Sequence, residues 1–352
     1  MARMRLPIAT LVTLCVLSAS ACTRTEPAEK PRPDAGSTAA PPSIALLESD
    51  DVPGRLAVTH AGVGTSPDLA DGPRRAAAEA LIRMEAGESA LDGAIAGTVT
   101  MEDDPRFNAG TGANIRLDGR TIQMDASLMA DDGRFAAVAV IERVKNPVLV
   151  ARAVLDSPHV LLAGEGATRF AHRMGFEDVV PESEAARADY ARRVAEVKRA
   201  LELGEGDEWP ALWNFPNPLP PELASDAEKE TDTVGTVVRD GEGRFAATLS
   251  TGGTSVTLYG RVGDVPIYGA GLFAGPAGAV ACTGKGEEII RQSLARTVYR
   301  ALEDGLRARD AVRRAVAGFP EDAAVGLIAV DAKGWAVAAN EPMAYGVAPA
   351  ND

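Results

Sequence analysis

Apolar residues in the first half of the chain recur with the spacing of alternating strands and helices. Mainly apolar runs of strand length lie at 56–59, 135–141 and 159–163. Pro73 and Gly87 mark the ends of one predicted helix, because proline is favoured in the first helical turn and glycine just beyond the last. Ser89 has the capping-box spacing of a second helix, and Pro147 opens a third. Strands flanked by helices in this way are typical of a layered α/β or α+β domain.

The second half of the chain begins with a charged segment and then returns to a regular pattern. A charged helix is predicted from 184 through 198, and the Pro-, Asp- and Glu-rich run that follows is expected to be flexible over 200–232. Strand patterns at 234–238 and 245–249 flank the hairpin signal DGEG. Further on, the pattern predicts a helix at 310–318 and a hairpin within 325–339. One long amphipathic helix is predicted to present on one face Ile290, Leu294, Val298 and Ala301.

The first 22 residues have the pattern of a secretion signal. Arg3 and Arg5 precede an apolar run at 6–17, which is shorter than the ~20 residues of a membrane span. The small residues before Cys22 resemble a bacterial lipobox, in which the cysteine becomes the lipidated first residue; the alternatives are ordinary cleavage without lipid and an uncleaved anchor. We therefore expect a protein exported to the bacterial periplasm and held at a membrane by a lipid on Cys22. A flexible tether is expected at 23–43 and the folded domain at 44–352.

Composition excludes some classes of function. The chain has 352 residues, of which 46% are hydrophobic and 24% charged. This length and hydrophobic content are enough for a sizeable buried core. The formal net charge of −14 argues against nucleic-acid binding and favours solubility. Cys15 lies in the leader and Cys22 in the lipobox-like sequence, so Cys282 is the single cysteine of the predicted domain. No disulfide is expected within that domain, although the compartment is oxidising.

The charged run ends abruptly at Asp232 and Thr233, where a β-branched strand begins. Taken alone, Thr233 is simply the first residue of that strand, where threonine is common. If instead the Thr233 hydroxyl attacks the Asp232 carbonyl, and water opens the resulting ester, Thr233 becomes a chain N-terminus. A free α-amino group has a pKa of about 7.7 to 8.0, so near neutral pH it accepts the proton of its own hydroxyl. Nucleophile and general base are then one residue.

Six short motifs occur in the order and spacing of a known enzyme family. They are FNAGTG (107–112), MDAS (124–127), TVG (233–235), STGG (250–253), GRVGD (260–264) and CTGKGE (282–287). Over residues 55–345 the chain resembles the N-terminal-threonine asparaginases, a family that includes isoaspartyl peptidases and glycosylasparaginases. The resemblance implies an α+β fold, namely the four-layer αββα sandwich of N-terminal-nucleophile hydrolases. It also implies self-cleavage into subunits 23–232 and 233–352, and a dimer of such cleaved pairs.

The resemblance assigns catalytic roles to five of these residues. Thr233 is the nucleophile, Thr251 polarises it, and Asn108 supports it from the FNAGTG loop. Thr283 and the backbone N–H of Gly284 form the oxyanion hole, in which one donor contributes about 3 kcal/mol. Outside the resemblance, Thr251 is only a turn residue before two glycines.

Substrate and ion binding are also implied by the resemblance. Arg261 binds the substrate α-carboxylate through charge-assisted hydrogen bonds, and Asp264 binds the α-ammonium group. Thr283 and Gly284 also contact the substrate, and Gly286 allows its close approach. The alternative for Arg261 and Asp264 is a local surface ion pair of little energetic value. No catalytic cofactor is expected, but a structural sodium ion is implied, held by backbone groups of Met101, Glu102, Asp104, Phe107, Ala109 and Thr111.

Some positions depart from the family pattern. His60 begins HAGVG where family asparaginases usually read HGGAG, so the turn differs and His60 is a weak site candidate. Asp232 is the residue that glycosylasparaginases place before the nucleophile, whereas Thr231 replaces the histidine of those enzymes. Lys285 stands where other residues occur in relatives. A phosphate-binding loop near Lys285 is excluded, because Gly286 replaces the required Ser or Thr.

These observations predict a self-activated threonine hydrolase. It cleaves β-aspartyl dipeptides and L-asparagine, forms a β-aspartyl ester on Thr233 and releases L-aspartate. The alternatives are a glycosylasparaginase and a non-catalytic envelope lipoprotein. Expected partners are small β-aspartyl molecules, without nucleic acid, and with a membrane only through lipid on Cys22.

Overall fold

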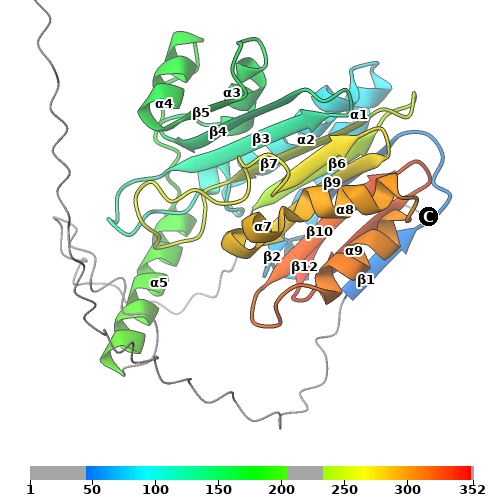
Figure 1. Ribbon diagram of the computed structural model, residues 1–352. Helices are drawn as coiled ribbons and strands as arrows, with labels where there is room; N and C mark the ends of the chain where they lie inside the picture. The colour runs from blue at the N-terminus through cyan, green and yellow to red at the C-terminus, as the bar shows by residue number, and fades with distance from the viewer. Residues whose placement is uncertain (1–44, 204–232, 350–352) are drawn as a thin grey trace, which may run out of the picture. The chain divides into compact units, whose positions relative to one another are not determined.

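Two β-sheets form the centre of the folded unit (Figure 1). The structure is a computed structural model, and it describes residues 45–203 and 233–349. Within these residues, the first sheet has the strand order β1 (Ala45–Ser49), β11 (Trp335–Ala339), β10 (Val325–Asp331), β9 (Gly278–Gly284) and β8 (Leu272–Gly275). The second has the order β12 (Met343–Ala348), β2 (Leu56–Val63), β6 (Val234–Arg239), β7 (Phe245–Thr251), β3 (Met124–Ala130), β4 (Phe135–Ile141) and β5 (Leu161–Ala163). Neighbouring strands are antiparallel except for β4 and β5.

The two sheets contact each other, and helices cover their strands. β9 and β10 of the first sheet lie against β2 and β6 of the second. On the second sheet lie the helices α1 (Asp71–Glu85), α2 (Ala90–Glu102), α3 (Pro147–Val154) and α4 (Gly164–Arg173). On the first sheet lie α8 (Leu294–Glu303) and α9 (Ala308–Ala317). Every residue of β6, β7 and β10 is buried, as expected for strands covered on both faces.

Helix α2 packs closely against the two strands that carry the TVG and STGG motifs. A Cβ atom at Gly97 would lie 2.8 Å from Oγ1 of Thr236, so only glycine allows this approach. The Thr98 hydroxyl lies 3.2 Å from that of Thr236 and 2.7 Å from that of Thr248. Buried hydroxyl groups must be hydrogen-bonded, and this network therefore fixes α2 on β6 and β7.

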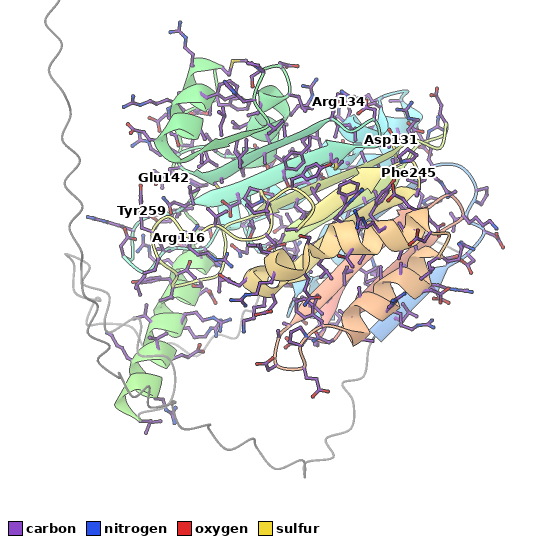
Figure 2. The ribbon with its side chains drawn as sticks, in the orientation of Figure 1. Arg116, Asp131, Arg134, Glu142, Phe245 and Tyr259 are labelled. Carbon is purple, nitrogen blue, oxygen red and sulfur yellow. The ribbon has the colours of Figure 1, made fainter. Side chains whose placement is uncertain are left out.

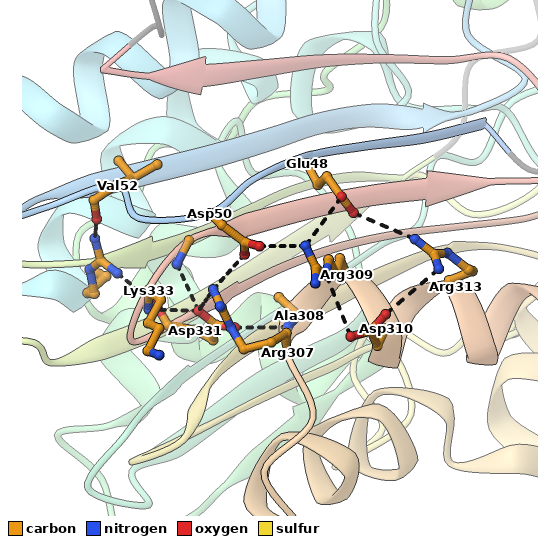
Figure 3. A network of polar contacts seen from close by, with 12 residues as sticks. Glu48, Asp50, Val52, Arg307, Ala308, Arg309, Asp310, Arg313, Asp331 and Lys333 are labelled. Atoms are coloured by element: carbon orange, nitrogen blue, oxygen red, sulfur yellow. Dashed lines mark hydrogen bonds and ion pairs between the residues drawn. The ribbon is translucent and has the colours of Figure 1, made fainter.

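Charged side chains join β1, the β10–β11 turn and α9 (Figure 3). Asp331 accepts hydrogen bonds from Nε of Arg307 at 2.9 Å and from the backbone N–H of Ala308 at 2.9 Å. Asp50 pairs with Arg307 at 2.7 Å and with Arg309 at 2.5 Å. Burial raises the pKa of Asp331, but its bonds to Arg307 and to backbone N–H groups outweigh this and hold the pKa below its usual value.

Most predicted elements are confirmed, but the long amphipathic helix is wrong. The chain forms α7 (Gly286–Gln292) and then α8, with Ser293 between them in the left-handed conformation at φ 46°. The backbone N–H groups of Ala295 and Arg296 donate to the carbonyl oxygens of Ala270 and Gly269, at 3.0 and 2.9 Å. These bonds hold the first turn of α8, so α8 is a separate helix and not a continuation of α7.

Two further boundaries differ from the prediction. The HAGVG sequence at 60–64 is expected to form a turn, but β2 continues through it to Val63, because β6 pairs with one edge as far as His60 and β12 pairs with the other. The charged helix α5 (Glu184–Glu202) is longer than predicted. The signal sequence, tether and most of the predicted flexible segment lie outside the described residues. Among the helices of 45–203 and 233–349, none has the length and apolar character needed to cross a membrane.

Candidate active site

Thr233 lies at the start of β6, and Thr251 is the last residue of β7. In the antiparallel pair, Val234 is opposite Ser250, so Thr233 and Thr251 both lie just beyond the last β6–β7 pair, at the same end of the two strands. Both threonines are buried, with 4% and 2% of their surface exposed. Thr251 Oγ1 accepts a hydrogen bond of 2.9 Å from the N–H of Gly253, which turns the chain away from the strand. The fold therefore places the two threonines that sequence analysis assigned to one reaction at the same end of the β6–β7 pair.

Asn108 connects the FNAGTG loop to the turn after Thr251. Its side-chain N–H donates to the Gly253 carbonyl at 2.8 Å, and its backbone carbonyl accepts from the Gly252 N–H at 3.0 Å. Asn114 donates to the same Gly253 carbonyl at 2.8 Å. Sequence analysis missed Asn114, for which the signal was its position just beyond the FNAGTG motif. The two asparagines together fix the turn that holds Thr251.

Thr283 and Gly284 end β9, where the first sheet meets β2 of the second. The Thr283 hydroxyl is fully buried and accepts a hydrogen bond of 3.2 Å from the Val63 N–H. Gly284 has φ 130°, and an added Cβ atom would collide with the Ala324 carbonyl. Only glycine suits this backbone conformation.

Arg261 and Asp264 converge on Gly286, the first residue of α7. A Cβ atom at Gly286 would lie 2.9 Å from Nη2 of Arg261 and 2.9 Å from Oδ1 of Asp264. Asp264 is 4% exposed, and the Arg261 side chain is 15% exposed. Both side chains are therefore largely withdrawn from solvent and meet at α7, while their binding roles stay predictions.

Glu287 is a partner of Arg261 that sequence analysis missed. Its two carboxylate oxygens accept hydrogen bonds of 3.0 Å from Nε and Nη2 of Arg261. Burial lowers the pKa of Arg261, but the bonds to Glu287 and its negative charge raise the pKa above the usual value. The guanidinium therefore stays charged, as binding of a carboxylate requires. Lys285 is exposed at the start of α7.

His60 lies on β2 and is paired with Gly235 of β6, two residues after Thr233. A Cβ atom at Gly235 would lie 2.5 Å from Nε2 of His60. Nδ1 accepts a hydrogen bond of 3.2 Å from the Gly62 N–H, so the proton of the neutral ring is on Nε2. Burial lowers the pKa of His60 to about 3, although the Thr233 backbone partly opposes the shift. His60 is therefore neutral at physiological pH and packs against Gly235, close to Thr233 in sequence.

The predicted sodium loop has backbone groups of a suitable kind. Carbonyl oxygens of Phe107 and Ala109 each accept one backbone hydrogen bond, at 2.9 and 3.1 Å, and each retains a second lone pair. Added Cβ atoms at Gly110 and Gly112 would meet the carbonyl oxygens of Glu102, Pro105 and Phe107, so the loop is closely packed around the two glycines. Oxygen ligands of this type suit hard cations. Within the described part of the chain, no group of three or more His, Cys, Asp or Glu side chains suits a metal ion.

Comparison with known proteins identifies the family. Residues 59–350 match the family described as asparaginase. The chain belongs to the asparaginase family. It is 40% identical over 289 residues to a plant-type L-asparaginase of Pyrococcus furiosus, covering 79% of this chain and 90% of the relative. It is 42% identical over 259 residues to an isoaspartyl peptidase of Salmonella typhimurium, covering 71% and 77%.

A plant relative has the same coverage as the archaeal one. The probable isoaspartyl peptidase/L-asparaginase 2 of Arabidopsis thaliana is 36% identical over 300 residues, covering 79% of this chain and 90% of the relative. The predicted family membership is confirmed, and so is the α+β fold, which is of the N-terminal-nucleophile hydrolase type. Asp232 and Cys22 lie outside the described residues of this asparaginase-family protein.

Substitution of Gly286 with alanine is expected to raise KM about 10-fold or more, because the new methyl group displaces both Arg261 and Asp264. Steady-state kinetics with L-asparagine provides the measurement. Gly166 in α4 is the matched control, since a Cβ atom there meets nothing within 4 Å. Its alanine variant should keep the native KM. Equal KM values for the two variants would contradict the placement of Gly286 at the substrate site.

Proposed function

We propose that this protein is an N-terminal-threonine hydrolase that cleaves β-aspartyl dipeptides and L-asparagine and releases L-aspartate. The main support is that Thr233 and Thr251 lie at the same end of the β6–β7 pair and that Arg261 and Asp264 converge on Gly286. The relatives named isoaspartyl peptidase and plant-type L-asparaginase give the same substrate class. Helices on both sheets, and contacts between the sheets, support an αββα sandwich of four layers.

The first chemical step activates the enzyme. The Thr233 hydroxyl attacks the Asp232 carbonyl carbon, the peptide C–N bond breaks, and the acyl group moves from nitrogen to oxygen. Water then hydrolyses the ester, which leaves a carboxylate on Asp232 and a free amine on Thr233. The larger subunit ends at 232 and the smaller starts at 233, and we infer that two such pairs form a dimer.

Each catalytic cycle then uses the new amine. It accepts the proton of the Thr233 hydroxyl, which Thr251 polarises, while the oxygen attacks the side-chain amide carbon of the substrate. The Thr283 hydroxyl accepts from the Val63 N–H, so its own proton is available for the developing oxyanion, together with the Gly284 N–H. The amine or ammonia leaves with a proton. Water hydrolyses the β-aspartyl ester and releases L-aspartate.

Recognition depends on the zwitterion common to these substrates. Arg261 binds the α-carboxylate and Asp264 the α-ammonium group, and the small Gly286 leaves space beside both. A sodium ion bound by the backbone of the 101–111 loop would neutralise its carbonyl dipoles. The residues of this loop then keep Asn108 in place to support the Thr251 turn.

A side-by-side assay of three substrates tests the proposal. The kcat/KM values for a β-aspartyl dipeptide and for L-asparagine should exceed the value for N4-(β-N-acetylglucosaminyl)-L-asparagine. Asp232 before the nucleophile favours glycosylasparaginase as the second candidate, which the opposite ranking would establish. A cleaved protein that hydrolyses none of the three would instead fit a non-catalytic envelope protein.

We also propose export to the bacterial periplasm with a lipid anchor, on the basis of the N-terminal sequence. Mass spectrometry of the mature N-terminus should find diacylglyceryl on Cys22. An unmodified Cys22, or a chain that retains its first residues, would rule out the anchor.

A further inference from the structure

Arg116 is a fully buried arginine close to the proposed substrate site. Only 1% of its surface is exposed. Nη1 donates to the Thr257 hydroxyl at 2.7 Å, and Nη2 donates to the carbonyl oxygens of Gln123 at 3.2 Å and Arg261 at 3.1 Å. Within the described residues, no carboxylate lies within ion-pair distance of it. Burying a charge whose hydrogen-bond acceptors are all neutral costs free energy of folding. The contacts of Arg116 are therefore expected to serve a function.

The Arg116 guanidinium also lies against the turn that follows Thr251. A Cβ atom at Gly253 would be 2.9 Å from Nη1. Figure 2 shows Arg116 near Glu142 and Tyr259, at the end of the second sheet opposite to Asp131 and Phe245. One side chain therefore contacts both the turn of the polarising threonine and the backbone of the carboxylate-binding arginine.

Two further side chains of the same segment bind the same loop. The Gln123 side-chain oxygen accepts from the Gly260 N–H at 2.7 Å. The Asp125 carboxylate accepts from the Gly263 N–H at 3.3 Å and from the Val140 N–H at 2.7 Å. Residues 257–264, here called the substrate loop, are thus held through their backbone by Arg116, Gln123 and Asp125. Burial lowers the pKa of Arg116 to about 10, which still leaves it charged at neutral pH.

We propose that Arg116 is a positioning residue that fixes the substrate loop relative to the Thr251–Gly253 turn, so that Arg261 is aimed at the substrate α-carboxylate. This inference rests on the proposed function. The planar guanidinium donates in several fixed directions at once, whereas a lysine ammonium does not reproduce that geometry. Because Arg116 donates to the loop that carries Arg261, its loss is expected to weaken substrate binding more than it slows the attack by Thr233.

The test compares Arg116→Met with Arg239→Met. Arg239 is a matched control, because it is 4% exposed and donates to the backbone carbonyls of Gly54 and Asp331 at 2.9 Å, and of Val52, at the far end of β6. We expect Arg116→Met to raise KM for L-asparagine about 10-fold or more, with kcat changed less than about 3-fold and with self-cleavage retained. Arg239→Met should leave KM within about 2-fold of the native value.

Two further variants keep the proposal testable if Arg116→Met does not fold. Thr257→Val removes one acceptor of Arg116 without deleting a buried charge, and it should also raise KM while kcat is preserved. Arg116→Lys should show a KM close to that of Arg116→Met. A native KM in the lysine variant, or equal KM changes in the Arg116 and Arg239 variants, would overturn the positioning role. A native enzyme that cleaves no β-aspartyl substrate would instead refute the proposed function.

Discussion

Replacing Thr233 with alanine is expected to leave the chain uncut after residue 232 and to lower hydrolysis of L-asparagine about 10⁴-fold or more. The reason is that one hydroxyl serves as nucleophile both in the cut and in each catalytic cycle. Denaturing gel electrophoresis and an ammonia-release assay measure the two effects on the same preparation.

Thr236 provides the matched control for this experiment. It lies on the same strand, is fully buried, and bonds with Thr98. Thr236→Ala should lose about 1 kcal/mol of stability but remain cut and active. A Thr233→Ala protein that is still cut, or an uncut form that still hydrolyses substrate, would contradict the assignment of the nucleophile.

Replacing Arg261 with leucine is expected to raise KM for L-asparagine about 100-fold, since charge-assisted hydrogen bonds contribute about 1.5–3 kcal/mol. The native enzyme should strongly prefer L-asparagine over β-alaninamide, which has the same amide and amine but no α-carboxylate. The variant should lose most of this preference. The measurement is the ratio of kcat/KM for the two compounds.

Arg244→Leu controls for loss of an arginine–carboxylate pair elsewhere. Arg244 binds Asp131 at 2.9 Å from the other end of β7. Its variant should keep the native substrate ratio. If Arg261→Leu also kept that ratio, the α-carboxylate would be bound by another group.

The residues that sequence analysis found are those within short motifs. Four residues could be predicted because each lies in a motif that resembles the family pattern: Thr233, Thr251, Asn108 and Thr283. The fold then places the first two at the same end of the β6–β7 strand pair. Their chemical roles stay predictions until the variants are measured.

The residues that it missed act across long distances in sequence. Arg116 and Arg261 are 145 positions apart. Neither Arg116 nor the segment around it shows a sequence pattern that predicts this contact. Glu287 lies within the CTGKGE motif and Asn114 just beyond FNAGTG, but their roles depend on the partners that the fold brings to them, Arg261 and the Gly253 carbonyl. The break between α7 and α8 was also hidden, because the bonds that fix it come from the carbonyl groups of Gly269 and Ala270 in an earlier loop.

The intact mass of the purified native protein, measured under denaturing conditions, tests the central claim most directly. The account predicts two masses, one for a fragment that ends at Asp232 and one for residues 233–352 with a free threonine amine. A single mass for the uncut chain, in a preparation that hydrolyses L-asparagine, would contradict it.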